Sequence, residues 1–335
     1  MTATNHSANQ GRVPAQGVPA QQMPTTAPAA PVQSAPVPAQ QGQVLQAPHG
    51  HQTPAQQGQV LQAPHGQVPA QQRAPRRRVQ AKQTFFSVFR SEWSKLASLR
   101  STWITAAIAS LITIGISVLI MAQYSGMKGY ADKAANYLTV GSSFGQIAVA
   151  VLGALLITGE YSSGQIRSSL AAVPRRGRLF AAKALVVAIF SALLGLVTVA
   201  LTYLLSLPIL GDKAGSLSNP EYLGFFWGTA MAFAIIGLMA MSFGYILRST
   251  AGSISLVVVL LFVLLIPLGL AASKWEWVRY ITDVLPSSSA AAVADPYHLL
   301  GTITKLDHGA VIASGYAWAI IPMIIAFFVF SKRDA

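Results

Sequence analysis

The residues best suited to bind another molecule lie in one charged segment, GEYSSGQIRSSLAAVPRRGRLFAAK at 159–183. Its charged side chains are Glu160, Arg167, Arg175, Arg176, Arg178 and Lys183. The apolar stretches 139–158 and 184–207, which hold no charged residue, flank it. Basic residues near an anionic membrane surface contribute about 1 kcal/mol each. The arginines could therefore simply contact lipid phosphates and fix the orientation of the protein in the membrane.

The order of residues within this segment indicates more than an anchor. A Ser-Ser-Gly turn at 162–164 precedes Ile166, Leu170 and Val173, whose spacing predicts a short helix with one apolar stripe. Pro174 ends that helix and the arginines follow. The segment therefore predicts a shaped docking surface.

Other patterns that could carry chemistry are weak. The string GSSFG at 141–145 matches the serine G-x-S-x-G pattern, but it opens an apolar run and has no strand-to-helix elbow, so small residues for helix packing explain it better. Neither G-x-x-x-x-G-K-[ST] nor H-E-x-x-H occurs, and the chain has no cysteine. We therefore expect no catalytic residue, cofactor or metal in this chain.

Histidines give two further metal-site candidates. The HGH string at 49–51 could coordinate a transition metal, but incidental polar residues in a solvated tail are the commoner explanation. Asp295 and His298 lie in the segment 273–312, where no third ligand is evident and a solvated loop is favoured. Trp275, Trp277 and Tyr280 in the same segment are typical of anchors at a headgroup layer.

Composition places these segments in a membrane. The chain is 53% hydrophobic and 10% charged, with a mean hydropathy of +0.48. The net charge of +13 does not indicate nucleic-acid binding, because the basic residues cluster at the ends of apolar segments. Six apolar runs are long enough to span a bilayer as helices: 102–123, 139–158, 184–207, 223–246, 253–272 and 313–330. The sequence predicts an all-α integral membrane protein with six transmembrane helices.

Charge placement predicts the orientation and the source of energy. Seventeen Lys and Arg lie in the residues before the first apolar run, the 159–183 loop, the turn at Arg248 and the C-terminal end. Cytoplasmic segments carry the excess of Lys and Arg, so both termini should be cytoplasmic. The predicted spans hold no ionisable residue, and Glu160 lies only at the edge of the second. This pattern argues against proton-coupled transport and intramembrane proteolysis, although sodium coupling through carbonyl oxygens stays possible.

The first 102 residues contain two other segments. Residues 1–82 hold twelve of the 19 prolines with abundant Gln and Ala, and a unit AQQGQVLQAPHG occurs at 39–50 and 55–66, which predicts a disordered cytoplasmic tail. After it, Phe85, Phe89, Trp93 and Leu96 recur at helical spacing, which predicts an amphipathic helix in the membrane interface. The alternative is that these residues form the lower turns of a long first span.

Three strings resemble the membrane subunits of ABC transporters of the type-2 permease (exporter) family, in particular the actinobacterial type. They are FRSEWSKLASLRSTW at 89–103, the 159–183 segment and LRSTAGSI at 247–254. The likeness covers a six-span permease domain at 83–335, and the tail has no counterpart in the family pattern.

The resemblance implies the permease of an ATP-driven exporter in the cell membrane, paired with a second permease copy as a homodimer or heterodimer and with separate ABC ATP-binding subunits. Membrane lipids are the other expected partner. In this family the loop between the second and third spans is similar to a coupling helix seated on the ATPase, and the interfacial helix also leans on it. Carried over to this chain, the coupling interface would comprise Glu160, Tyr161, Ser162, Ser163, Gly164, Arg167, Pro174, Arg175 and Arg176.

Two other functions stay open from sequence. A transport-inactive sensor or scaffold could use its basic tail and loop to recruit partners to the membrane, and a secondary transporter would be driven by an ion gradient. An adjacent gene for an ATPase would favour export, and one for a kinase or peptidase would favour the scaffold. The uncharged spans favour an amphiphilic or lipid-like cargo over a small ion.

Overall fold

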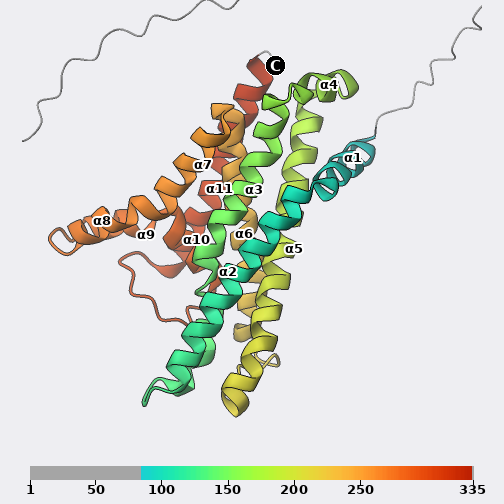
Figure 1. Ribbon diagram of the computed structural model, residues 1–335. Helices are drawn as coiled ribbons and strands as arrows, with labels where there is room; N and C mark the ends of the chain where they lie inside the picture. Colours follow the sequence, from blue (N-terminus) through green and yellow to red (C-terminus); the bar gives the residue numbers. More distant parts are fainter. Residues whose placement is uncertain (1–83, 334–335) are drawn as a thin grey trace, which may run out of the picture. The chain divides into compact units, whose positions relative to one another are not determined.

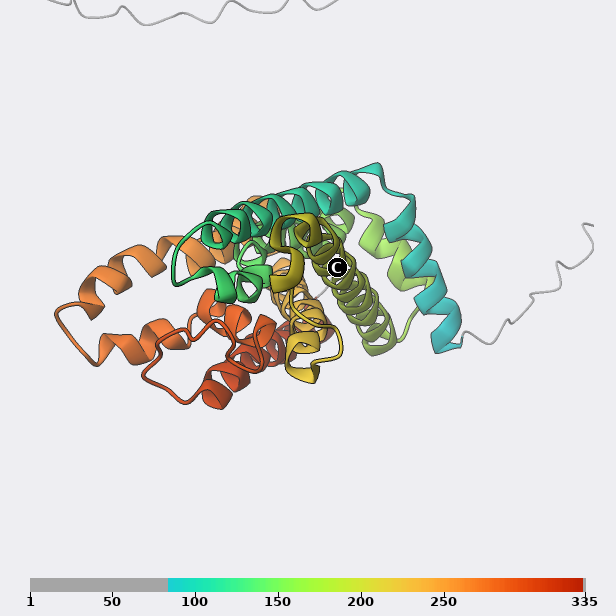
Figure 2. The same cartoon turned by 90° about the horizontal axis from the view of Figure 1, so that it is seen from below.

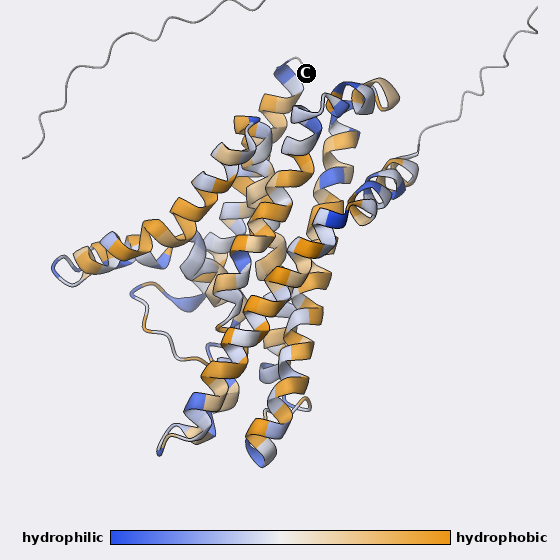
Figure 3. Cartoon of the chain, in the orientation of Figure 1, coloured by the Kyte–Doolittle hydropathy of each residue, from blue (hydrophilic) through white to orange (hydrophobic). Residues whose placement is uncertain are grey.

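The computed structural model describes residues 84–333, and the predicted tail at 1–82 lies outside the described residues. Within the described part of the chain every regular element is a helix and there is no strand, which confirms the predicted all-α class. Figure 3 shows hydrophobic residues along the helices and hydrophilic residues near their ends and on α1.

Six helical segments are long and apolar enough to cross a membrane, which confirms the predicted number of spans. They are α2 (Arg100–Ser125), η1 (Ala131–Thr139) with α3 (Ser142–Ser162), α5 (Arg176–Leu210) with η2 (Gly211–Lys213), α6 (Pro220–Leu247), α7 (Thr250–Val258) with η3 (Val259–Val263) and α8 (Leu265–Ala272), and α11 (His308–Lys332). The second and third spans are longer than predicted, so Glu160 and Lys183 lie inside span helices rather than in a loop.

Helix α6 forms the centre of the bundle and contacts α3, α5 and α11 (Figure 1). Its residues Phe233, Ile236, Met239 and Met241 are fully buried or nearly so. Its sequence is apolar on all sides, as is typical of a helix surrounded by others.

Glycines allow the helices of this core to approach closely. A Cβ atom added to Gly153 of α3 would overlap the backbone of Gly237 on α6, and one added to Gly195 of α5 would meet the backbone of Thr229. Small residues at helix contacts are the usual means by which membrane helices pack, because van der Waals contact replaces the hydrophobic effect there.

The fifth span leaves the bundle. A π-helical turn, η3, separates α7 from α8, and α8 extends away from α6 beside the short helix α9 (Val278–Asp283) (Figure 1). The exposed side chains of this span include Val263, Ile266 and Leu270. Lipid or another polypeptide must therefore cover this surface in a membrane.

The segment that follows is folded, so its interpretation as a solvated loop is wrong. Helix α10 (Pro286–Ala294) packs against α6 and α11, with Ser289, Ala290 and Ala294 buried. The Ser289 hydroxyl lies 2.6 Å from that of Ser314 on α11. This helix consists mostly of serine and alanine, so its sequence lacks the large apolar residues from which a buried helix would have been predicted.

The aromatic residues before α10 remain at the surface. Trp275, Trp277 and Tyr280 are 55%, 62% and 49% exposed, which suits anchors at a headgroup layer. Nearby, Lys305 forms an ion pair with Glu276 and lowers the pKa of that exposed carboxyl group through a hydrogen bond and charge attraction.

Helix α1 (Phe85–Ser98) is separate from the first span. The chain is extended at Leu99, with φ −80° and ψ 119°, and turns sharply between α1 and α2 (Figure 2). The alternative of one continuous first helix is therefore wrong. The Thr84 side chain accepts a hydrogen bond from the Ser87 amide and caps the start of α1.

Candidate functional site

The charged segment at 159–183 begins with a tight reversal of the chain. Helix α3 ends at Ser162, and the hydroxyl groups of Ser162 and Ser163 donate hydrogen bonds to the Gly159 carbonyl at 3.1 and 2.7 Å. Gly164 then adopts φ +70°, a left-handed conformation that favours glycine. The predicted Ser-Ser-Gly turn therefore directs the chain into a second helix.

That second helix, α4 (Gln165–Ala172), has one buried face. Ile166 and Val173 are buried and Leu170 is partly buried, which confirms the predicted apolar stripe. They belong to a cluster that includes Val88 of α1 and Phe330 of α11. The helix ends at Ala172, two residues before Pro174. Packing of its apolar face against this cluster holds α4 in place and leaves its opposite face exposed.

The expected interface residues divide by exposure. Ser162, Ser163, Gly164, Arg167, Pro174 and Arg175 are exposed, and we call these six residues the α4 surface. Tyr161 and Arg176 are partly buried, and Glu160 is buried. The Arg248 guanidinium lies 5.0 Å from the centre of the Tyr161 ring, so Tyr161 belongs to a contact within the chain.

Arg176 also acts within the chain. Its guanidinium donates hydrogen bonds to the carbonyl oxygens of Phe330, Ser331 and Arg333 at 3.0, 3.3 and 2.7 Å. These carbonyls lie at the C-terminal end of α11, where the helix dipole favours a cation. Arg176 therefore ties the start of α5 to the end of the last span.

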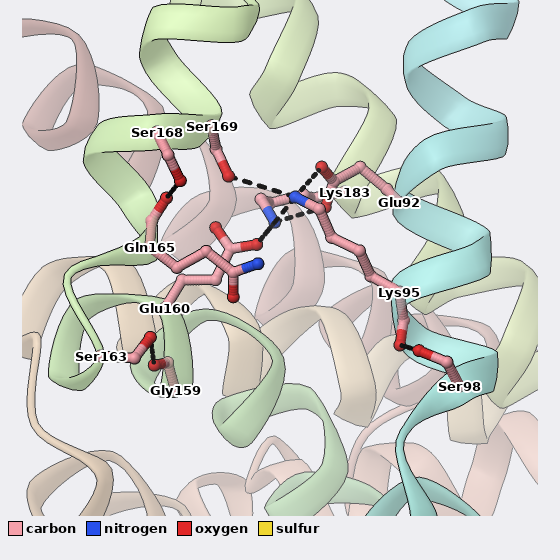
Figure 4. Close-up of polar contacts among 10 residues, drawn as sticks. All are labelled: Glu92, Lys95, Ser98, Gly159, Glu160, Ser163, Gln165, Ser168, Ser169 and Lys183. Carbon is pink, nitrogen blue, oxygen red and sulfur yellow. Dashed lines mark hydrogen bonds and ion pairs between the residues drawn. The ribbon is translucent and has the colours of Figure 1, made fainter.

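Four charged residues meet beneath α4, and we call them the ion cluster: Glu92, Lys95, Glu160 and Lys183 (Figure 4). Lys183 Nζ donates to Glu92 Oε2 at 2.5 Å and to Glu160 Oε1 at 2.6 Å. Lys95 Nζ donates to Glu92 Oε1 at 2.7 Å and to Glu160 Oε1 at 3.2 Å. It also donates to Ser169 Oγ of α4 at 3.1 Å.

Charge balance makes burial of the ion cluster possible. Lys183 is fully buried, and Glu92 and Glu160 are 4% and 6% exposed. Two cations face two anions, so each charge has a partner of opposite sign, as buried charges require. Burial alone would lower the pKa of Lys95, but hydrogen bonds and charge attraction from Glu92 and Glu160 outweigh it and raise that pKa.

The ion cluster connects four helices. Glu92 and Lys95 lie on α1, Glu160 on α3 and Lys183 on α5, and Ser169 adds α4. A displacement of α4 would therefore act on the ends of the second and third spans through charged contacts as well as through apolar packing. This arrangement can transmit a mechanical movement.

Sequence reasoning missed this cluster. Glu92 lies on the buried stripe of α1 with Val88 and Leu96, whereas the predicted apolar face comprised Phe85, Phe89, Trp93 and Leu96 and no charged residue. Of the predicted interfacial residues, Leu96 is buried, Phe89 and Trp93 are partly buried and Phe85 is 42% exposed. The available signal was the spacing of four residues between Val88, Glu92 and Leu96, which puts an acid on an apolar stripe.

The metal-site candidates have other roles where they are described. Asp295 accepts hydrogen bonds from the backbone amides of Leu299 and Leu300 at 2.8 and 2.9 Å, and His298 stacks on His308. No group of three or more potential metal ligands occurs between residues 84 and 333. The HGH string at 49–51 lies outside the described residues.

Comparison with known proteins gives one family. The family model described as ABC-2 family transporter protein matches residues 88–264, which is just over half of the 335 residues and includes most of α1, all of α4 and the whole ion cluster. A search of curated proteins finds no match.

Proposed function

Because this chain belongs to the ABC-2 family transporter proteins, we propose that it is the permease subunit of an ATP-driven exporter, and that a separate ABC ATP-binding subunit docks on the α4 surface. The family makes the chain a multi-pass membrane component of a transporter and implies association with ABC ATP-binding subunits. The direction of transport and the place of docking are the proposal.

One observation supports docking at this site: the apolar face of α4 packs against the rest of the protein, while the opposite face is exposed. Ile166 and Val173 are buried, and Arg167 and Arg175 are exposed on the other side. The chain has no phosphate-binding loop of the G-x-x-x-x-G-K-[ST] type, so ATP hydrolysis is assigned to the partner. An acidic groove on that partner would complement the two arginines.

The contacts below α4 supply a route for the force. We propose that ATP-driven movement of the partner pushes α4, and that the ion cluster and the apolar cluster around Ile166 pass this movement to α3 and α5. Charged and close-packed contacts favour rigid-body movement over local bending. Glu160 then serves inside the permease rather than by direct contact with the partner.

The remaining features of the proposal concern the surroundings. The permease would lie in the cell membrane with both termini and α4 on the cytoplasmic side. A second permease copy would complete the pathway, and lipids would cover the exposed apolar side chains of the spans. The basic residues at the α4 end of the bundle support this orientation.

The test measures ATPase coupling with reversed charges. The full chain is purified with its ABC ATP-binding subunit and reconstituted in vesicles, and vanadate-sensitive ATP hydrolysis and retention of the subunit are measured. We expect the double variant Arg167→Glu, Arg175→Glu to reduce retention of the ATP-binding subunit about tenfold or more, because close charge pairs across an interface contribute 1.5 kcal/mol or more.

The matched control makes the same change of charge at the other end of the bundle. Lys128 is exposed in the connection that follows α2 and Lys133 is exposed at the start of η1, so Lys128→Glu, Lys133→Glu should leave retention and ATP hydrolysis unchanged. Equal effects of the two double variants would refute docking on the α4 surface.

A further inference from the structure

A groove opens beside the ion cluster. It has a volume of about 490 Å³ and lies between α1 and α2 on one side and α3 on the other, with Lys183 of α5 and Gln165 of α4 also in its lining. This volume is in the range of about 300–1,000 Å³ that is typical of small-molecule sites. Transport and docking on the α4 surface do not require an occupant for it.

The lining changes from polar to apolar along the direction of the spans. Glu160, Ser163 and Gln165 lie at the end near α4, whereas Leu152 and Leu155 lie deeper along α3. Eight residues separate Leu152 from Glu160, which is about 12 Å along a helix. A ligand that fits this groove has a polar head near α4 and an apolar part that points toward the bilayer centre.

The mouth of the groove faces the lipid-exposed side of the bundle. Leu155 is 37% exposed and Leu99 is 50% exposed, and both line the groove. Ser101 and Gln165, which are also exposed, place a hydroxyl group and an amide group at the polar end. A lipid of the adjacent leaflet can therefore enter sideways with its chains among leucines and its head among hydrogen-bond donors.

The ion cluster determines the charge of the head that fits. Two cations and two anions already balance, so a head with a net charge would leave one charge uncompensated in a buried site. Glu160 Oε2 is buried and accepts no hydrogen bond from residues 84–333. The three N–H groups of Lys95 already donate to Glu92, Glu160 and Ser169, so the donors left for a ligand at this end of the groove are the Gln165 amide group and the Ser101 hydroxyl group.

From these contacts we infer that the groove binds a phospholipid with a phosphoethanolamine head, drawn from the leaflet on the α4 side. Its primary ammonium group donates a hydrogen bond to Glu160 Oε2, and its phosphate accepts from the side-chain amide group of Gln165 and the hydroxyl group of Ser101, which both line the groove. The head is zwitterionic, so the charge of the site stays balanced. A choline head has no N–H group and leaves the Glu160 oxygen without a donor.

The test uses the full chain in detergent with defined lipids. Native mass spectrometry measures retention of phosphatidylethanolamine, phosphatidylcholine and phosphatidylglycerol with identical acyl chains. We expect phosphatidylethanolamine to be retained about tenfold more tightly than phosphatidylcholine, which lacks an N–H donor, because a hydrogen bond to a charged group has roughly that effect on affinity. It should also be retained more tightly than phosphatidylglycerol, because the balanced ion cluster leaves the net negative charge of that head uncompensated. Equal retention of the three lipids, or a preference for phosphatidylglycerol, would overturn the inference.

Two variants locate the lipid. Leu155→Trp fills the apolar end of the groove and should remove the preference for phosphatidylethanolamine, and Glu160→Gln should remove its advantage over phosphatidylcholine. The control Leu119→Trp makes the same change at a leucine of α2 that is 70% exposed and does not line the groove. If Leu155→Trp retains the same lipids as Leu119→Trp, the lipid does not lie in this groove.

Discussion

Replacing Lys183 by methionine removes one cation from the centre of the ion cluster. Lys183 is fully buried and donates two hydrogen bonds, one to Glu92 and one to Glu160. A hydrogen bond to a charged group contributes about 1.5–3 kcal/mol, so two give about 3–6 kcal/mol. Breaking a buried ion pair from one side costs about 3–5 kcal/mol, which agrees. We therefore expect Lys183→Met to lower the free energy of unfolding by about 3–5 kcal/mol.

Two comparisons separate loss of charge balance from loss of the lysine. Adding Glu92→Gln to Lys183→Met leaves Lys95 opposite Glu160, so the double variant should recover more than about 1 kcal/mol of the loss. The control Lys213→Met makes the same substitution in the exposed ion pair with Asp132, where Nζ and Oδ1 are 3.3 Å apart and the side chains are 49% and 93% exposed. An exposed pair contributes about 0–1 kcal/mol.

The assay is reversible unfolding of the full chain by sodium dodecyl sulfate in mixed micelles, followed by tryptophan fluorescence. The reasoning is refuted if Lys183→Met loses no more stability than Lys213→Met. It is also refuted if the double variant is no more stable than Lys183→Met alone, because charge balance would then not govern the cluster.

Three more substitutions test other contacts. The pKa of Lys95 is raised in the folded protein, so the stability that Lys95 contributes is fully present below pH about 10.4, where an unfolded lysine titrates. That stability is lost as the pH rises through the folded pKa. Lys95→Met should therefore lack this alkaline loss of stability when unfolding is measured over a series of pH values. Arg176→Gln should destabilise the end of α11 by about 1–2 kcal/mol, seen as faster hydrogen exchange of its last turn, whereas Arg175→Gln should not. Gly153→Ala should lower stability by about 1–3 kcal/mol through a backbone clash with α6, in contrast to Gly115→Ala, where a Cβ meets nothing within 4 Å, and thermal unfolding compares the two. Equal results within any of these pairs would contradict the contact concerned.

The spans could be predicted because their signal is local. A run of apolar residues such as 223–246 is long enough to cross hydrocarbon whatever surrounds it, and the structure contains a helix there, α6. The apolar stripe of α4 was equally local, since Ile166, Leu170 and Val173 fall within eight residues of each other. The ends of the spans were less certain, because α3 and α5 extend beyond the apolar runs to include Glu160 and Lys183.

Residues far apart in sequence form the candidate site, and their charges alone did not indicate it. Glu92 and Lys183 are 91 positions apart and meet at 2.5 Å only because α1 packs against α5. The hydrogen bonds of Arg176 to the terminal carbonyl groups of α11, more than 150 positions later, could not be predicted from the sequence. Helix α10 was concealed for the same reason, since its serines and alanines are buried by other helices rather than by their own hydrophobicity.

The amino-acid sequence alone determined that this chain is an all-α membrane protein with six spans, because the need to satisfy backbone hydrogen bonds in hydrocarbon acts on each apolar run separately. It also determined the helical stripe and the basic residues of the segment at 159–183. Tertiary structure decided which charges of that segment are exposed and which are neutralised inside. Burial of a charge depends on a partner of opposite sign within a few ångströms, and only packing of α1, α3 and α5 brings such partners together.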